Sequence, residues 1–192
     1  MDMEYYQEIT LLPDCEVPVT FLWTKLFGML HLAFVNQQKE NNAEFGISFP
    51  QYSENGVGEK MRIFAEKKEM LEALQLDRVL NRMRDYVHIV SVRKIPVRRL
   101  TGYAIYSRYQ PDASVEQKAR RYAKRHPESS YEEALEFMKQ RTEKYQLPFI
   151  QIKSLSNGQF FPLFIRKKTV EEESNNGFGT YGLSAKSSVP EF

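Results

Sequence analysis

The chain has 192 residues and a net charge of +2, with 42% hydrophobic and 27% charged residues, a balance typical of a folded protein rather than a disordered one. No apolar run approaches the roughly 20 residues that a membrane span needs, and the first ten residues show no secretory signal. Cys15 is the single cysteine and the three histidines are scattered, which excludes an internal disulfide and a zinc site of usual spacing. We therefore expect a cytoplasmic protein with no cofactor, no metal and no membrane partner.

Charge is distributed unevenly along the chain. Residues 1–90 contain 9 Lys/Arg and 14 Asp/Glu, residues 91–168 contain 17 and 7, and residues 169–192 contain 1 and 4. The three segments therefore carry charges of −5, +10 and −3. A basic middle segment is typical of a protein that binds a polyanion such as nucleic acid, although solvated faces with counter-charges folded against them would give the same count.

The first half of the chain alternates between strand and helix patterns. Strict alternation in residues 3–12 predicts an edge strand, and apolar residues at helical spacing in 19–37 predict a helix with a broad buried face. The elements expected after these are strands at 45–51 and 60–66, one or two short helices within 67–85, and a strand at 86–96. The order β-α-β-β-α-β predicts a ferredoxin-like (RRM-like) α+β domain in residues 1–95.

The second half, residues 96–192, is expected to form a distinct C-terminal α+β domain. Its expected elements are an extended segment at 98–107, helices at 114–126 and 131–145, and a hairpin of strands at 147–154 and 159–168. Ser114 is the expected N-cap of the first helix, while Ser130 and Glu133 form a capping box before the second. The tail from Glu171 is polar and rich in glycine.

The helix expected at 114–126 is strongly basic. Its cations are Lys118, Arg120, Arg121, Lys124 and Arg125. Like charges four residues apart destabilise a helix unless a partner relieves them. A nucleic-acid groove would supply phosphates for this purpose. Neutralisation by Glu128, Glu132 and Glu136 of the following helix is the alternative explanation.

His31 is the candidate catalytic side chain of the first helix. It lies between Phe27 and Phe34 at helical spacing, so a partly buried histidine at the edge of the core is one interpretation. The other is a general acid or base, because imidazole exchanges protons near neutral pH. Gly28, one turn earlier, leaves space that a substrate could occupy.

Several segments together resemble the CRISPR repeat-processing endoribonuclease of type I-F systems. They are collinear and extend over residues 1–192: LFGMLHLAF, FGISFP, VGEKMRIF, LPFIQIKSLSNGQFFPLFIR, TYGLS and VPEF. The resemblance implies a protein that binds the hairpin of each CRISPR repeat and cleaves at the 3′ base of the stem without a metal. It further implies that the protein stays bound to the mature crRNA and joins the other subunits of the surveillance complex. We expect it to be monomeric when free.

The resemblance also assigns roles to individual residues. By position, His31 matches the catalytic histidine, Ser154 the serine that holds the nucleophilic ribose, and Tyr181 a tyrosine that supports the site. Phe161 matches the aromatic residue that stacks on the base of the stem. The basic positions that match the groove-binding residues are Arg120, Arg121, Lys124 and Arg125, with Lys118 on the same helix. Attack by the ribose 2′-OH would leave a 2′,3′-cyclic phosphate, with His31 acting as base or as acid.

The sequence departs from the family pattern at the base-reading positions. Members carry an Arg-x-Gln pair there, and the aligned residues in this chain are Gly102 and Ala104. We therefore expect Arg98, Arg99 or Arg108 to read bases instead, or sequence readout near the cut to be weak. Two other functions stay open: an RNA-hairpin-binding subunit with little or no cleavage, and a ferredoxin-like domain that binds protein partners.

Overall fold

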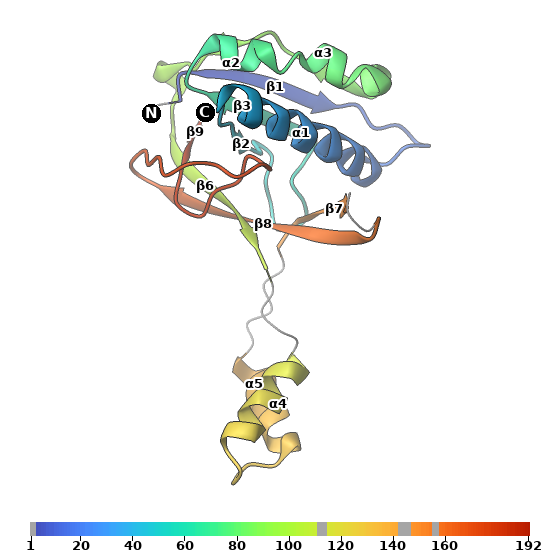
Figure 1. Cartoon of the computed structure of the whole chain (residues 1–192), viewed down its shortest axis with the longest axis vertical. Helices are drawn as coiled ribbons and strands as arrows, with labels where there is room; N and C mark the ends of the chain where they lie inside the picture. The colour runs from blue at the N-terminus through green and yellow to red at the C-terminus, as the bar shows by residue number, and fades with distance from the viewer. Residues whose placement is uncertain (1–2, 111–114, 142–146, 155–157) are drawn as a thin grey trace. The chain divides into compact units, whose positions relative to one another are not determined.

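The computed structural model describes residues 3–110, 115–141, 147–154 and 158–192. The chain forms two compact units, residues 1–109 with 147–192 and residues 110–146 (Figure 1). Helices combined with antiparallel sheets confirm the predicted α+β class. One hydrophobic core joins both sheets of the first unit. The domain boundary expected between residues 95 and 96 stays a prediction.

The first sheet has the strand order β2-β3-β1-β4, and β5 also pairs with β1. Its strands are β1 (Tyr5–Leu11), β2 (Gly46–Ser48), β3 (Lys60–Ala65), β4 (Val87–Ile89) and β5 (Arg93–Lys94). The edge position predicted for β1 is wrong, because β3 and β4 pair with its two sides. The single strand expected at 86–96 is split, since β4 pairs with the end of β1 and β5 with its start. Alternation reports which face is buried, but not how many neighbours a strand has.

Helix α1 (Val19–Asn41) supplies the largest part of the core. The sequence predicts its end at residue 37, but the helix continues to Asn41. Asn42 then ends it by taking the left-handed conformation, with φ 50°. Its buried side chains are Leu22, Trp23, Leu26, Phe27, Leu30, Ala33 and Phe34. The short helices that follow are α2 (Lys68–Ala73) and α3 (Leu76–Val79). A 3₁₀ helix, η1 (Asn81–Tyr86), replaces most of the second α-helix expected within 67–85.

By length and composition alone, α1 could cross a membrane, contrary to the expectation that no apolar stretch is long enough. The same property is common in core helices of folded proteins. About a third of the apolar window is buried, and this buried face packs into the core of the first unit. The helix also packs against β7 (Phe149–Lys153) of the second sheet. Its apolar character is therefore explained in part by the packing of the first unit.

The second sheet has the strand order β7-β8-β6-β9. Its other strands are β6 (Gly102–Tyr109), β8 (Phe160–Val170) and β9 (Val189–Glu191). The 3₁₀ turn η2 (Val97–Arg99) replaces the start of the extended segment expected at 98–107. Strand β9 was not expected within the polar tail. Three residues are too few to show alternation, and pairing with β6 defines this strand.

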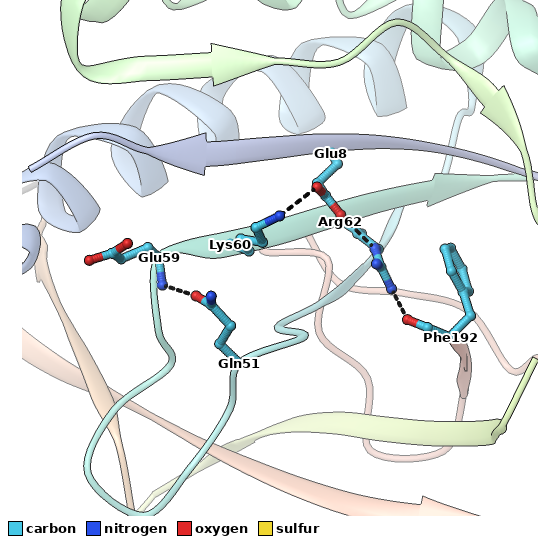
Figure 2. Close-up of polar contacts among 6 residues, drawn as sticks. All are labelled: Glu8, Gln51, Glu59, Lys60, Arg62 and Phe192. Carbon is cyan, nitrogen blue, oxygen red and sulfur yellow. Dashed lines mark hydrogen bonds and ion pairs between the residues drawn. The ribbon is translucent and has the colours of Figure 1, made fainter. Parts of the chain in front are cut away.

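The last residues of the chain connect the two sheets (Figure 2). Arg62 on β3 donates to Glu8 on β1 at 2.9 Å and to the backbone oxygen of Phe192 at 2.6 Å. Its guanidinium also lies 4.0 Å from the centre of the Phe192 ring. Burial opposes ionisation of Glu8, but hydrogen bonds and charge from Arg62 and Lys60 outweigh it and lower the pKa of that carboxyl. The segment after β8 is thereby held against the first sheet.

The second unit is a pair of helices, α4 (Val115–Arg125) and α5 (Tyr131–Arg141). The capping box is confirmed: Ser130 N donates to Glu133 Oε2 at 2.9 Å, and Glu133 N to Ser130 Oγ at 3.2 Å. Ala119 and Ala134 are the buried residues within its described part, and Tyr122 packs against Phe137 at 5.2 Å between ring centres. The expected N-cap Ser114, the helix end at 142–145 and the hairpin turn at 155–157 lie outside the described residues.

Candidate functional site

His31 and Tyr181 lie face to face. Their ring centres are 4.2 Å apart and the planes differ by 11°, and both side chains are partly buried. Tyr181 stacks on Phe27 at 6.4 Å, and Phe27 stacks on the fully buried Phe49 at 6.2 Å. The imidazole therefore sits at the outer end of a series of rings that begins in the core. Two of the three predicted catalytic residues are in direct contact.

A hydrogen bond orients the imidazole. Its Nδ1 lies 3.0 Å from the backbone oxygen of Thr180. A carbonyl oxygen can only accept, so Nδ1 must carry the proton. In the neutral ring the lone pair is then on Nε2, and a protonated ring would present an N–H at the same position. The arrangement suits either a general base or a general acid acting through Nε2.

A tight turn holds Tyr181 against the helix. Gly182 N donates to Gly179 O at 2.8 Å, and Gly179 N donates to Leu183 O at 2.9 Å. The turn is attached to both sheets, because Ile47 N donates to Gly182 O at 3.0 Å and Ser184 N to Tyr106 O at 2.9 Å. Gly182 has φ +71°, which glycine adopts without strain. The sequence TYGLS thus supplies both the tyrosine and the geometry that presents it.

Gly182→Ala is expected to destabilise this turn. A Cβ would lie 2.6 Å from Cγ2 of the buried Ile47, in a backbone conformation that side chains disfavour. Strain and overpacking together should cost about 2–4 kcal/mol and displace Tyr181. Thermal unfolding measures the loss. Gly56→Ala is the matched control, because the nearest atom to its Cβ is 4.0 Å away. Equal losses in the two variants would contradict this explanation.

Ser154, Phe161 and Arg108 share one face of the second sheet. Ser154 continues β7 on the same side as the buried Ile152, and Ile152 pairs with Phe161 on β8. Arg108 lies with its guanidinium 5.6 Å from the Phe161 ring centre. Because β7 packs against α1, this face is directed toward the helix that carries His31. A direct approach of Ser154 to the imidazole stays a prediction.

The two expected base-reading positions, Gly102 and Ala104, offer no side chain to RNA. Ala104 is fully buried between Val189 of β9 and Thr169 of β8, and Gly102 is the first residue of β6. A long polar side chain at residue 104 would have to enter the core. Arg108 and Gln110, by contrast, are exposed at the end of β6 and have the Arg-x-Gln spacing. This spacing is visible in the sequence as Arg108-Tyr109-Gln110.

The basic helix presents its cations to solvent. Arg120, Arg121, Lys124 and Arg125 are exposed, while Lys118 is partly buried. No ion pair joins the four exposed cations to an acidic side chain among the described residues 115–141. Glu128, one of the expected neutralising residues, pairs with His126 at 3.0 Å. Among the described residues, Glu128, Glu132 and Glu136 therefore form no direct ion pair with these four cations.

Within the described ranges, no group of three or more His, Cys, Asp or Glu side chains could hold a metal ion. His88 and Cys15 are both exposed. The backbone oxygen of Thr180 is a member of the site that sequence reasoning missed. Backbone groups carry no residue-type signal, so only the folded chain identifies it.

Comparison with known proteins assigns this two-sheet α+β chain to a CRISPR-associated family. A family model described as "CRISPR-associated protein (Cas_Csy4)" matches residues 6–192, and this chain belongs to that family. It is 35% identical over 193 residues to the CRISPR-associated endonuclease Cas6/Csy4 of Pseudomonas aeruginosa (strain UCBPP-PA14). It is 31% identical over 194 residues to the endonuclease of the same name from Escherichia coli (strain UTI89 / UPEC). Both comparisons cover 99% of this chain and 100% of the relative.

Proposed function

We propose that this chain is a metal-independent endoribonuclease that binds the CRISPR repeat hairpin and cleaves at the 3′ base of its stem. The observation that carries the proposal is the orientation of His31, whose Nδ1 is held by Thr180 O so that Nε2 is available for proton transfer. Tyr181 fixes the plane of the ring by stacking. The names of the two relatives, both endonucleases, support the same activity.

In the proposed reaction RNA supplies its own nucleophile. Ser154 holds the ribose so that the 2′-oxygen lies in line with the adjacent phosphate. As the 2′-oxygen bonds to phosphorus, its proton passes to a neutral Nε2 of His31, and the bond from phosphorus to the 5′-oxygen breaks. The leaving 5′-oxygen takes up a proton from water, and the His31 imidazolium returns its proton to solvent, which leaves a 2′,3′-cyclic phosphate and a 5′-OH. Acid–base catalysis of this kind contributes about 100- to 10,000-fold, and positioning contributes the rest.

After cleavage, the protein remains on the crRNA as a subunit of the surveillance complex in the cytoplasm, and it is monomeric when free. We also propose that residues 1–95 form a ferredoxin-like domain and residues 96–192 a separate RNA-binding domain. The order β2-β3-β1-β4 of the first sheet supports the ferredoxin-like assignment. The exposed Arg-rich face of α4 supports binding in an RNA groove.

Arg108 and Gln110 are the proposed base readers at the foot of the stem. Arg108 lies beside Phe161, the residue proposed to stack on the last base pair. A guanidinium next to the stacking ring can reach the edge of a terminal guanine and bind it through two hydrogen bonds. The family's Arg-x-Gln pair is then retained in this chain as Arg108-Tyr109-Gln110.

Cleavage is expected to proceed in excess chelator. The assay incubates the chain with the host's own repeat hairpin in EDTA and analyses the product ends. A 2′,3′-cyclic phosphate at the 3′ base of the stem is the expected result, because no step of the proposed reaction uses a metal. Strict dependence on added Mg²⁺ or Mn²⁺ would contradict metal independence. A hairpin that is bound tightly but never cut would instead favour the inactive RNA-binding subunit.

The basic helix is expected to supply affinity rather than catalysis. Changing Arg121 or Arg125 to Ala should weaken hairpin binding and reduce the slope of log K against log salt by slightly less than one unit for each phosphate that is no longer neutralised. Binding titrations at several salt concentrations measure the slope. Lys139→Ala, a change of an exposed cation on α5, is the control. An unchanged slope in the arginine variants would show that those side chains do not bind phosphate.

A further inference from the structure

The second sheet has an outer face, directed away from its buried side, that the proposed reaction does not use. Its centre is a row of three aromatic residues at directly opposed positions: Phe149 on β7, Phe164 on β8 and Tyr109 on β6. Phe149 and Phe164 lie 5.5 Å apart between ring centres. Phe149 is 54% exposed, and Phe160, farther along β8 on the same face, is 58% exposed. Contiguous patches of exposed apolar side chains, unlike single exposed rings, mark interaction surfaces on folded proteins.

Cations are interleaved with these rings. Arg166 lies 4.5 Å from the Tyr109 ring centre, and Lys153 lies 5.9 Å from that of Phe160. Lys168 is exposed on the same side of β8. The outward positions of β6, β7 and β8, all of them described, contain no Asp or Glu. Flat rings combined with positive charge are complementary to unpaired nucleotides, whose bases stack and whose phosphates are anionic.

The position of this face connects it to the cleavage site. Phe160 and Phe161 are consecutive residues of β8, so their side chains point to opposite sides of the sheet. Phe161 is on the side proposed to hold the base of the stem. An RNA strand that leaves the base of the stem at Phe161 therefore needs to pass only around the end of β8 to reach Phe160 and the aromatic row on the other side of the sheet.

We propose that the outer face of the second sheet binds the single-stranded RNA next to the stem, stacking its bases on Phe149, Phe160 and Phe164. This inference rests on the proposed function, since it concerns the flank of the same RNA. Lys153, Arg166 and Lys168 neutralise the phosphates of that flank. The face extends the bound RNA beyond the hairpin without using sequence-specific contacts.

The test compares affinities for three RNAs: the bare hairpin, the hairpin with about eight unpaired nucleotides on its 5′ side, and the hairpin with the same extension on its 3′ side. A 2′-deoxy nucleotide at the cut site prevents cleavage. For the wild type, at least one extension should tighten Kd about tenfold or more. In the double variant Phe149→Ala/Phe160→Ala the ratio of bare to extended Kd should fall close to one. Lys168→Ala should lower the salt slope for the extended RNA by about 0.7 unit.

Phe21→Ala is the matched control, because Phe21 is 51% exposed on α1 with the ammonium of Lys25 5.3 Å from its ring centre. In Phe21→Ala the ratio of the Kd for the bare hairpin to the Kd for the extended hairpin should equal that of the wild type. A wild type that binds the bare hairpin but gains nothing from either extension overturns this inference and leaves the endonuclease proposal intact. If Phe149→Ala/Phe160→Ala keeps the wild-type ratio of bare to extended Kd, the inference is also overturned. It is overturned as well if the wild type self-associates and this double variant abolishes the self-association. Failure to bind the bare hairpin overturns the proposed function itself.

Discussion

His31→Ala should lower the single-turnover cleavage rate by about 100- to 10,000-fold while leaving hairpin affinity nearly unchanged. The imidazole is the titratable group that Thr180 and Tyr181 hold in a single orientation. Alanine removes the proton acceptor, but it removes no positive charge from the basic helix. The two effects are separated by measuring the rate at saturating protein and Kd for an RNA that lacks the nucleophilic 2′-OH.

Two further variants test whether the loss of cleavage is specific to His31. His88→Ala changes an exposed histidine of β4 and should cleave at the wild-type rate. Ser154→Ala should reduce the rate more mildly than His31→Ala, because it affects the position of the ribose rather than proton transfer. If hairpin affinity falls as far as the rate in His31→Ala, the histidine has a structural role and its assignment as the proton-transfer group is wrong.

Arg108→Ala should produce the second large effect, a loss of about 5- to 150-fold in affinity for the native hairpin. A bidentate arginine contributes about 1–3 kcal/mol of discrimination at a guanine. Inverting the terminal base pair of the stem should cost the wild type a similar amount, and it should cost Arg108→Ala almost nothing more. A double-mutant cycle over protein and RNA measures this coupling. Gln110→Ala should show the same pattern at the neighbouring pair.

Arg98→Ala and Arg99→Ala are the controls. Both arginines lie in η2, which precedes β6 and is separate from the Arg108-Tyr109-Gln110 segment. Lengthening the stem by one pair should weaken binding in all of these variants, because stacking on Phe161 requires only a flat terminal pair. A large loss on inversion that persists unchanged in Arg108→Ala would show that the base reader lies elsewhere in the chain.

Local sequence patterns were sufficient to predict helices, whose stability depends on residues within one continuous stretch of the chain. The apolar spacing of 19–37 predicts α1, and the spacing of Ser130 and Glu133 predicts the start of α5, which the structure confirms. These predictions succeed because helical periodicity and capping depend on residues only three or four positions apart. The candidate site residues were named from motifs, and their roles stay predictions until the variants above are measured.

Tertiary structure alone decided the features that join distant segments. His31 and Thr180 are 149 residues apart in the chain, and no local pattern indicates that a backbone oxygen of the tail orients the imidazole. The internal position of β1 and the existence of β9 depend on which strands pair, and the burial of Ala104 depends on β9. Periodicity specifies the face that a segment buries. The partner that covers this face is determined by packing of the whole chain, because many segments offer an equally apolar surface.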